Sequence, residues 1–436
     1  MLSWQTTQLP RSSISTNADH TDAPTPLKAS EAADIIVVGA LAVDYSCNYS
    51  PLNQLDPEVS PVLQTSNPAT ISQTLGGVAH NIALAAHLVG ANAKLCSLVG
   101  EDLAGSIALQ QLEAEEMDAS YIQVLKTERT SQYVAVNDAK KDLVIAMADM
   151  GILERHGESI TLSLAEIVQK QRPKWLISDA NLDSETLLKA LQEGKKIGAR
   201  TAFEPVSVAK AIRILDFPRL ANGLDSVNEG RLPIFPNHLI DLATPNQLEL
   251  AAMHTTAREN GHFESQEWWE IIDALGIPAS GARSRFVAAT TADIVNQGIP
   301  QQSMQLLPFI PCIITKLGPS GALLTMLFDK DDSRLSDSDV APYIISRSHS
   351  IHNAHPVGGV YMRLFPAAEA LRDSEILSVN GVGDTFLGAL IASAVRSERG
   401  IDKLVDFAQK AAVLTLRSQE AVSPALASLK GLLDSP

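Results

Sequence analysis

A glycine-rich turn near the C-terminal end of the chain carries the residues best suited to chemistry. It reads Asn380-Gly381-Val382-Gly383-Asp384, and the apolar spacing of residues 387–394 predicts an amphipathic helix directly after it. Free backbone N–H groups and the helix dipole at such a helix start favour a phosphate. A carboxylate beside that phosphate can accept the proton of an attacking hydroxyl. The turn therefore predicts phosphoryl transfer with Asp384 as the base. The alternative is that Asp384 only stabilises the helix start.

A second glycine pair, Gly76-Gly77, precedes a helix expected at residues 78–90, and Asn81 lies about one turn into that helix. Glycines permit close approach of a ligand, and the Asn81 amide can hydrogen-bond a sugar hydroxyl. Asp44 follows the first expected strand, at the end where open α/β sheets bind ligands. The alternatives are a tight turn, a backbone contact of Asn81 and a turn-forming Asp44.

Two further segments have the composition of a nucleotide site. Asn246 and Glu249 are three residues apart, so they share a helix face and suit a hydrated Mg²⁺ with its phosphates. Their alternative is an ordinary helix start. Lys316 and the glycines Gly318 and Gly321 follow another strand and could shelter a nucleotide, or form only a hairpin turn.

Alternating strands and helices must position these residues. Short β-branched runs predict buried strands, and apolar residues at i, i+3, i+4 and i+7 predict helices. The expected strands are 34–39, 95–100, 175–179, 201–204 and 313–315, and the expected helices are 78–90, 103–116 and 185–196. This alternation predicts a mainly parallel α/β sheet. Residues 131–150 break the rhythm and predict an antiparallel hairpin that covers the sheet.

The remaining segments define the expected domain. Residues 1–33 lack apolar periodicity and predict a disordered leader, with a mitochondrial transit peptide as the alternative because Arg11 is accompanied by no acid in the first 18 residues. Residues 34–436 are expected to form the catalytic domain, with insertions at about 218–237, 254–308 and 329–375. His349, His352 and His355 lie in a segment expected to be a loop, with no Cys or obvious carboxylate partner nearby. A solvated surface is therefore favoured over a metal site.

Composition excludes several partners. The 436 residues carry a net charge of −16, which disfavours broad binding to nucleic acid or an anionic membrane. The three cysteines show no metal or disulfide spacing, and no run of about 18 apolar residues exists. We therefore expect a cytoplasmic protein with a small-molecule substrate.

Taken in chain order, the motifs resemble the ribokinase-like (PfkB-type) family of sugar and nucleoside kinases. The order is an early Asp, Gly-Gly…Asn, Asn-x-x-Glu, Lys-x-Gly-x-x-Gly and Gly-x-Gly-Asp, between about Asp34 and about Leu426. The resemblance implies a three-layer α/β/α ribokinase-like domain. It also implies a small β lid with strands within about 44–75 and 130–150, through which a homodimer could form.

The resemblance also assigns roles. Asp384 would be the catalytic base, with Gly381, Val382 and Gly383 as the anion hole. The hydroxyls of the substrate would be bound by Asp44, Gly76, Gly77, Asn81 and Ser131. ATP would lie along Asn246, Lys316, Gly318 and Gly321, and Asn246 with Glu249 would organise Mg²⁺.

Within the family, the segments 130–150, 179–182 and 203–207 are similar to the pseudouridine kinase branch. The implied activity is ATP-dependent phosphorylation of the 5′-hydroxyl of a nucleoside, with pseudouridine as the expected substrate. Ribose, adenosine or a hexose are alternatives. Asn380 and Ser378 stand where the family usually has Thr and Asp, which leaves activation by a monovalent cation open and keeps a catalytically silent binding protein as an alternative. A dinucleotide oxidoreductase is disfavoured because the first strand lacks the later glycines of that fingerprint.

Overall fold

The protein contains a large main sheet and a smaller second sheet, and the candidate residues lie on these sheets and on the helices and turns connected to them. The computed structural model describes residues 32–51, 60–216, 232–277, 281–348, 356–397 and 399–433. Ten strands follow the order β13-β14-β12-β11-β10-β9-β8-β1-β4-β5. Neighbours from β5 to β11 pair in parallel, and β11, β12, β14 and β13 pair antiparallel.

The strands of this sheet are short and mostly buried. Their bounds are β1 Ile35–Val38, β4 Ala93–Gly100, β5 Ile122–Leu125, β8 Trp175–Asp179, β9 Arg200–Glu204, β10 Leu242–Ala243, β11 Cys312–Lys316, β12 Ala322–Asp329, β13 Ile344–Arg347 and β14 Val357–Phe365. In β1, Ile36 and Val38 face one core cluster, whereas Ile35 and Val37 face the other. Burial on both faces explains the continuous apolar runs of the parallel strands.

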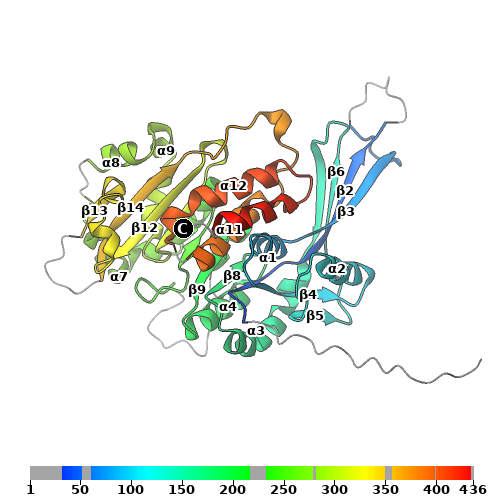
Figure 1. Cartoon of the computed structure of the whole chain (residues 1–436), viewed down its shortest axis with the longest axis horizontal. Coiled ribbons are helices and arrows are strands. Elements are labelled where there is room, and N and C mark those ends of the chain that lie inside the picture. The colour runs from blue at the N-terminus through cyan, green and yellow to red at the C-terminus, as the bar shows by residue number, and fades with distance from the viewer. Residues whose placement is uncertain are drawn as a thin grey trace, which may run out of the picture. The chain divides into compact units, whose positions relative to one another are not determined.

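Helices cover both faces of the sheet, as Figure 1 shows. One face carries α1 Val78–Leu88, α2 Leu103–Ala114, α11 Val382–Ser397, α12 Val405–Leu416 and the 3₁₀ segment Pro424–Leu433. The other carries α3 Gly151–Gln171, α4 Ser184–Lys196, α5 Val208–Ala211, α6 Gln247–Glu259, α7 Gln266–Ala274, α8 Ala282–Ala289, α9 Ala292–Asn296 and α10 Ile299–Leu306. The expected three-layer α/β fold is confirmed.

A second sheet has the order β3-β2-β6-β7. Its strands are β2 Ala42–Tyr49, β3 Ala69–Gly76, β6 Ser131–Asn137 and β7 Leu143–Asp149. β2 follows β1 almost directly, and β3 ends immediately before α1, so this sheet is connected to both substrate-side motifs. Asp102 ties it to the main body by accepting hydrogen bonds from the Thr130 N–H at 2.9 Å and the Gly105 N–H at 2.7 Å.

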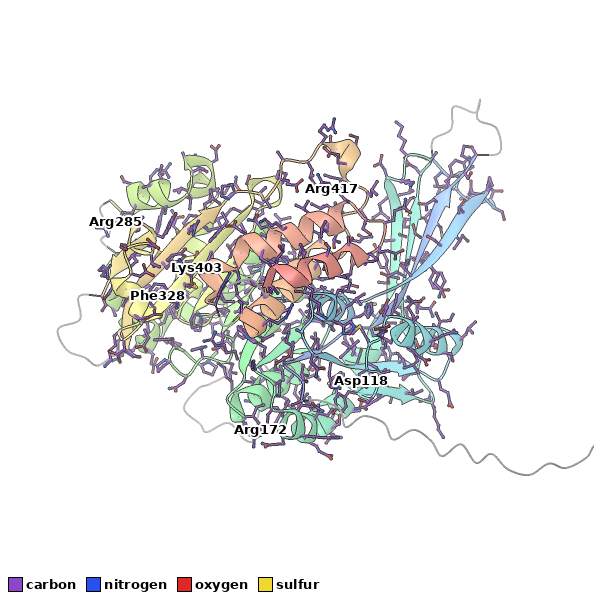
Figure 2. All side chains as sticks on the ribbon, viewed as in Figure 1. Asp118, Arg172, Arg285, Phe328, Lys403 and Arg417 are labelled. Carbon is purple, nitrogen blue, oxygen red and sulfur yellow. The ribbon has the colours of Figure 1, made fainter. Side chains whose placement is uncertain are left out.

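The segments expected as insertions contribute to the core. Phe263, Trp268 and Phe286 from 254–308 lie in the same apolar cluster as α3 and α4. Arg285 on α8, labelled in Figure 2, donates to the Ile345 carbonyl of β13 at 3.0 Å. Within 329–375, β14 is a nine-residue strand that sequence reasoning did not anticipate.

The predicted strands and helices before residue 205 and the hairpin at 131–150 are all present. Ala33, one residue before the expected start of the domain, is buried in the core. The leader up to residue 31, most of 218–237 and the three histidines at 349–355 lie outside the described residues. Within the described part of the chain, no helix is long and apolar enough to span a bilayer.

Candidate active site

Asp384 lies in the first turn of α11, directly after the glycine turn. The Thr385 N–H donates to the Gly381 carbonyl at 2.8 Å, so the N–H groups of Val382 and Gly383 have no acceptor within the helix. Gly381 has φ +68°, and a Cβ there would lie 2.0 Å from the Ala421 carbonyl oxygen. This crowding requires glycine and fixes where the helix starts.

The carboxylate of Asp384 is bound by the other glycine motif. Asn81 Nδ2 donates to Asp384 Oδ2 at 2.8 Å, across 303 residues of sequence. Burial raises the pKa of Asp384 to about 7; the nearby Glu204 carboxylate adds to the shift, whereas Asn81 and Lys316 oppose it. A carboxyl that titrates near neutral pH suits a general base.

Lys316, at the end of β11, places its ammonium beside the glycine turn. A Cβ at Gly383 would lie 2.8 Å from Lys316 Nζ, which shows how closely the two approach. Lys316 Nζ donates to Glu204 Oε1 at 2.9 Å. Burial opposes the charge of Lys316, but the carboxylates of Glu204, Glu249 and Asp384 outweigh it and raise the pKa of the ammonium. A cation is therefore held next to the backbone N–H groups.

Asn246 and Glu249 form a capping box at the start of α6. Asn246 Oδ1 accepts from the N–H groups of Leu248 and Glu249, both at 2.9 Å, and Glu249 Oε2 accepts from the Asn246 N–H at 2.8 Å. This is the ordinary helix start given above as the alternative. Burial raises the pKa of Glu249, while Lys316 opposes the shift. The only side-chain oxygen of Asn246 and one of the two carboxylate oxygens of Glu249 are thus committed to the helix, and the magnesium role stays a prediction.

Asp44 and the first glycine pair lie together at the base of the second sheet. Asp44 projects over Gly76, where a Cβ would lie 2.1 Å from Asp44 Oδ2. Burial raises the pKa of Asp44 to about 6, and the charge of His80 opposes the shift. Gly77 has φ +96°, and a Cβ there would lie 2.5 Å from the Ala40 carbonyl oxygen. Both glycines are therefore required by the fold itself, in addition to any contact with a ligand.

Ser131 begins β6 opposite Ala42. Its side chain is buried, and within the described residues its hydroxyl has no hydrogen-bond partner. Buried hydroxyls are normally paired, so this one is suited to a bound ligand or water.

The turn after Lys316 is a β-hairpin turn. The Leu317 N–H donates to the Gly321 carbonyl at 2.9 Å, and β11 and β12 pair antiparallel on either side. Gly321 is crowded by the Phe365 carbonyl, whereas a Cβ at Gly318 would meet open space. The hairpin is therefore shown, and the nucleotide role of Gly318 and Gly321 stays a prediction.

Sequence reasoning gave no role to Asp179, Glu204 or Glu115, which the structure places at or near the site. Asp179 is fully buried at the end of β8, where one carboxylate oxygen accepts from the N–H groups of Ala40 and Ala79, both at 2.9 Å. It thus joins the loop after β1 to the start of α1. The sequence signal that could have identified Asp179 is its position as an acidic residue at the carboxyl end of a predicted strand, the same signal that identified Asp44.

In the part of the chain that the structure describes, side chains alone do not form a closed metal site. Among the described residues, no group of three or more His, Cys, Asp or Glu side chains could hold a metal ion. Mg²⁺ in kinases keeps several waters and binds substrate phosphates, so one or two protein oxygens suffice. The free carboxylate oxygen of Glu249 fits that limited requirement, whereas the single side-chain oxygen of Asn246 already accepts two backbone hydrogen bonds.

The chain is similar in sequence to known carbohydrate and nucleoside kinases. Residues 32–227 match the model of the pfkB family carbohydrate kinases. A pseudouridine-metabolizing bifunctional protein of Schizosaccharomyces pombe is 32% identical over 405 residues, which cover 92% of this chain and 48% of that protein. The pseudouridine kinase of Escherichia coli is 28% identical over 191 residues, which cover 42% of this chain and 54% of that enzyme. The chain thus spans about half the length of these relatives.

A solved structure supports the fold. The Arabidopsis thaliana ribokinase complexed with ribose and ATP superposes with a TM-score of 0.55 at 15% identity, covering 93% of this chain and 100% of that one. At this identity the likeness establishes the α/β architecture alone.

Proposed function

Since the chain belongs to the pfkB family of carbohydrate kinases, we propose that it transfers the terminal phosphoryl group of ATP to the 5′-hydroxyl of a nucleoside, with pseudouridine as the substrate. The observation that carries this proposal is the hydrogen bond between Asn81 and Asp384. It joins the motif suited to a sugar hydroxyl with the motif suited to a phosphate, as a kinase requires.

Asp384 would act as the base. The 5′-oxygen of the nucleoside attacks the terminal phosphorus, the bond to the bridging oxygen breaks, and ADP leaves. Asp384 takes the proton that the hydroxyl loses. General bases of this kind contribute about 10²–10⁴-fold to the rate.

The backbone N–H groups of Val382 and Gly383 would stabilise the charge on the transferred group, together with the ammonium of Lys316. Phosphoryl transfer depends mainly on positioning and on charge neutralisation. Loss of a single preorganised donor typically costs about 10²–10³-fold. Asn246 and Glu249 would hold Mg²⁺, which neutralises phosphate charge when it is bound.

Asp44, Asn81 and Ser131 would bind the sugar side of the substrate. Asp44 and Ser131 belong to adjacent strands of the second sheet, and Asn81 lies in the first turn of α1, shortly after β3 of the same sheet. Pseudouridine, rather than another acceptor, is supported by the names of the two curated relatives. ATP as the donor is supported by the ribokinase complex.

A coupled ADP-release assay tests the proposal. Pseudouridine, uridine, adenosine, ribose and a hexose are offered to the protein side by side with MgATP. We expect the highest kcat/KM with pseudouridine. A higher kcat/KM with another acceptor would identify that acceptor as the substrate and leave the protein a kinase of the same family. Nucleoside binding by calorimetry with no ADP release from any acceptor would instead indicate a binding protein on this fold.

A further inference from the structure

His80 lies inside a chain of contacts that ends at the proposed base. The side chain is buried on α1, and its Nε2 lies 2.8 Å from Glu115 Oε2. Its Nδ1 lies 3.3 Å from Asn81 Oδ1. The other end of the same amide, Asn81 Nδ2, donates to Asp384 Oδ2 at 2.8 Å.

The oxygens on either side of the His80 ring indicate the direction of each hydrogen bond. A carboxylate oxygen and an amide oxygen only accept, so both contacts are hydrogen bonds when His80 donates from both ring nitrogens. With the oxygen of Asn81 held by His80, its NH₂ group must face Asp384. The opposite orientation of the amide would bring Oδ1 against the carboxylate of Asp384 and remove a donor from it.

The surroundings of Glu115 disfavour a negative charge, so its carboxylate is stabilised by a cation beside it. It caps the C-terminal end of α2, where the helix dipole disfavours negative charge, and Glu113 and Glu116 lie beside it in the sequence. Its second oxygen accepts from Gln111 Nε2 at 3.3 Å. An imidazolium at His80 offsets this unfavourable charge, and Gln111 restrains the carboxylate that faces the ring.

We propose that His80 and Glu115 are positioning residues that hold the Asn81 amide in the one orientation that donates to Asp384. The inference rests on the proposed function, because it assigns these residues to the same site. They do not touch the reacting atoms. Their effect passes through Asn81, whose donated hydrogen bond favours the ionised, proton-accepting form of Asp384.

Other charged groups also face this network. Glu204 from β9, Lys316 from β11 and Asp179 from β8 act on Asp384. Asp44 from β2 faces His80, and His87 lies near Glu115 and Glu116. All of these groups stay in place when His80 or Glu115 is replaced, so a change in the pH profile reports on the replaced residue.

The experiment compares His80→Phe, Glu115→Gln and the matched control Glu116→Gln. The control removes the same charge at the same helix end from an exposed residue. Values of kcat and KM are measured from about pH 6 to about pH 9, the range in which general bases operate. For His80→Phe we expect kcat below neutral pH to fall about tenfold, the effect of one lost hydrogen bond. Its acidic limb should move to higher pH, with the KM for ATP unchanged.

Glu115→Gln should move the acidic limb of the pH profile to higher pH as well, but by less than His80→Phe does. The profile of Glu116→Gln should match that of the wild type. A folded His80→Phe protein with an unchanged acidic limb would overturn the inference. So would a Glu116→Gln protein that behaves like Glu115→Gln. Thermal unfolding identifies a variant that fails to fold, and Glu115→Gln, which keeps the size of the side chain, then carries the test.

A second readout does not depend on activity. In protein labelled with ¹⁵N-histidine, the His80 signals are those absent from His80→Phe. We expect both ring nitrogens to be protonated at neutral pH in the wild type. A ring with a single proton would contradict the network. Failure of the wild type to release ADP with any acceptor would refute the proposed function, whereas the state of the ring would still decide the inference.

Discussion

At the scale of single residues, the site depends on carboxyls whose surroundings hold their pKa above the usual range. Burial dominates at both Asp384 and Asp44, and Asp384 also faces the Glu204 carboxylate. Lys316 and Asn81 limit the shift at Asp384. The balance leaves a base that is strong enough to accept a proton yet still ionised in a useful fraction at neutral pH.

The pH dependence of the rate follows from this balance. Since the pKa of Asp384 is raised to about 7, the protonated, inactive form of the base predominates below that pH. We expect kcat/KM for the nucleoside to rise with pH through a midpoint near 7 and then level off. The measurement is the initial rate at saturating MgATP. A profile already flat at pH 5 would show that no group with this raised pKa controls the reaction.

The glycine turns singled out Asp384 and Asn81 from the sequence, and the position after the first expected strand singled out Asp44. Their direct contacts were not predictable, because the partners of Asn81 and His80 lie 303 and 35 residues away. Such pairs arise only when α1, α2 and α11 pack together. Asp179 was missed for a similar reason, since its partners are backbone N–H groups of two other segments.

At the scale of elements, the two glycines at the start of α11 are expected to have different roles. Gly381 is required by the fold, and Gly383 by the binding of phosphate. Gly381 is crowded by the Ala421 backbone and has a positive φ, whereas Gly383 is crowded only by the flexible end of Lys316. Gly381→Ala should therefore destabilise the protein by about 1–3 kcal/mol. Gly383→Ala should keep the free energy of unfolding but lower kcat by at least about tenfold, because it displaces a charge that acts on the phosphate.

Chemical denaturation and steady-state kinetics on the two variants check this contrast. Equal loss of stability in both would mean that Gly383 also serves only the fold. Full activity of a stable Gly383→Ala protein would place the phosphate elsewhere.

Two substitutions of Asn246, at the start of α6, distinguish its role in helix capping from a role in ligand binding. Asn246→Ala removes the acceptor of the capping box and should cost about 1 kcal/mol of stability. Asn246→Asp keeps that acceptor, so its stability should equal that of the wild type. If Asn246 also contacts phosphate, the KM for MgATP should rise in both variants, because Ala removes the contact and Asp adds a negative charge that repels the phosphate. A wild-type KM in Asn246→Asp would limit this residue to capping.

Sequence periodicity predicted the buried parallel strands and the helices between them, since each carries a repeating apolar pattern. It did not predict β14, whose sequence includes Gly358, Gly359 and Arg363 within the strand. Nor did it show that residues 254–308 belong to the main core, because short helices such as α8 and α9 carry too few apolar residues for a clear period.

At the scale of the whole molecule, a strongly acidic chain is proposed to bind a triphosphate. Its net charge of −16 opposes anions at long range. At the site, the partly buried ammonium of Lys316 and the N-terminal end of α11 supply positive charge locally. The second sheet stands beside this site, and β7 exposes Leu143, Ile145 and Met147 on one face. A homodimer through that face stays a prediction.

Closure of the second sheet over the substrate would exclude water from the reacting phosphate. We therefore expect ATP hydrolysis without an acceptor to be far slower than phosphorylation of the nucleoside. ADP release is measured with and without the acceptor found in the panel assay. Equal rates in the two conditions would show that the sheet does not protect ATP from water.

The account rests on the carboxylate of Asp384 as the group that takes the proton. The most direct measurement is the turnover of Asp384→Asn at saturating substrates, with nucleotide binding and thermal unfolding measured on the same sample. We predict a folded protein that binds ATP normally and turns over at least about 10²-fold more slowly. Turnover equal to that of the wild type would contradict the account.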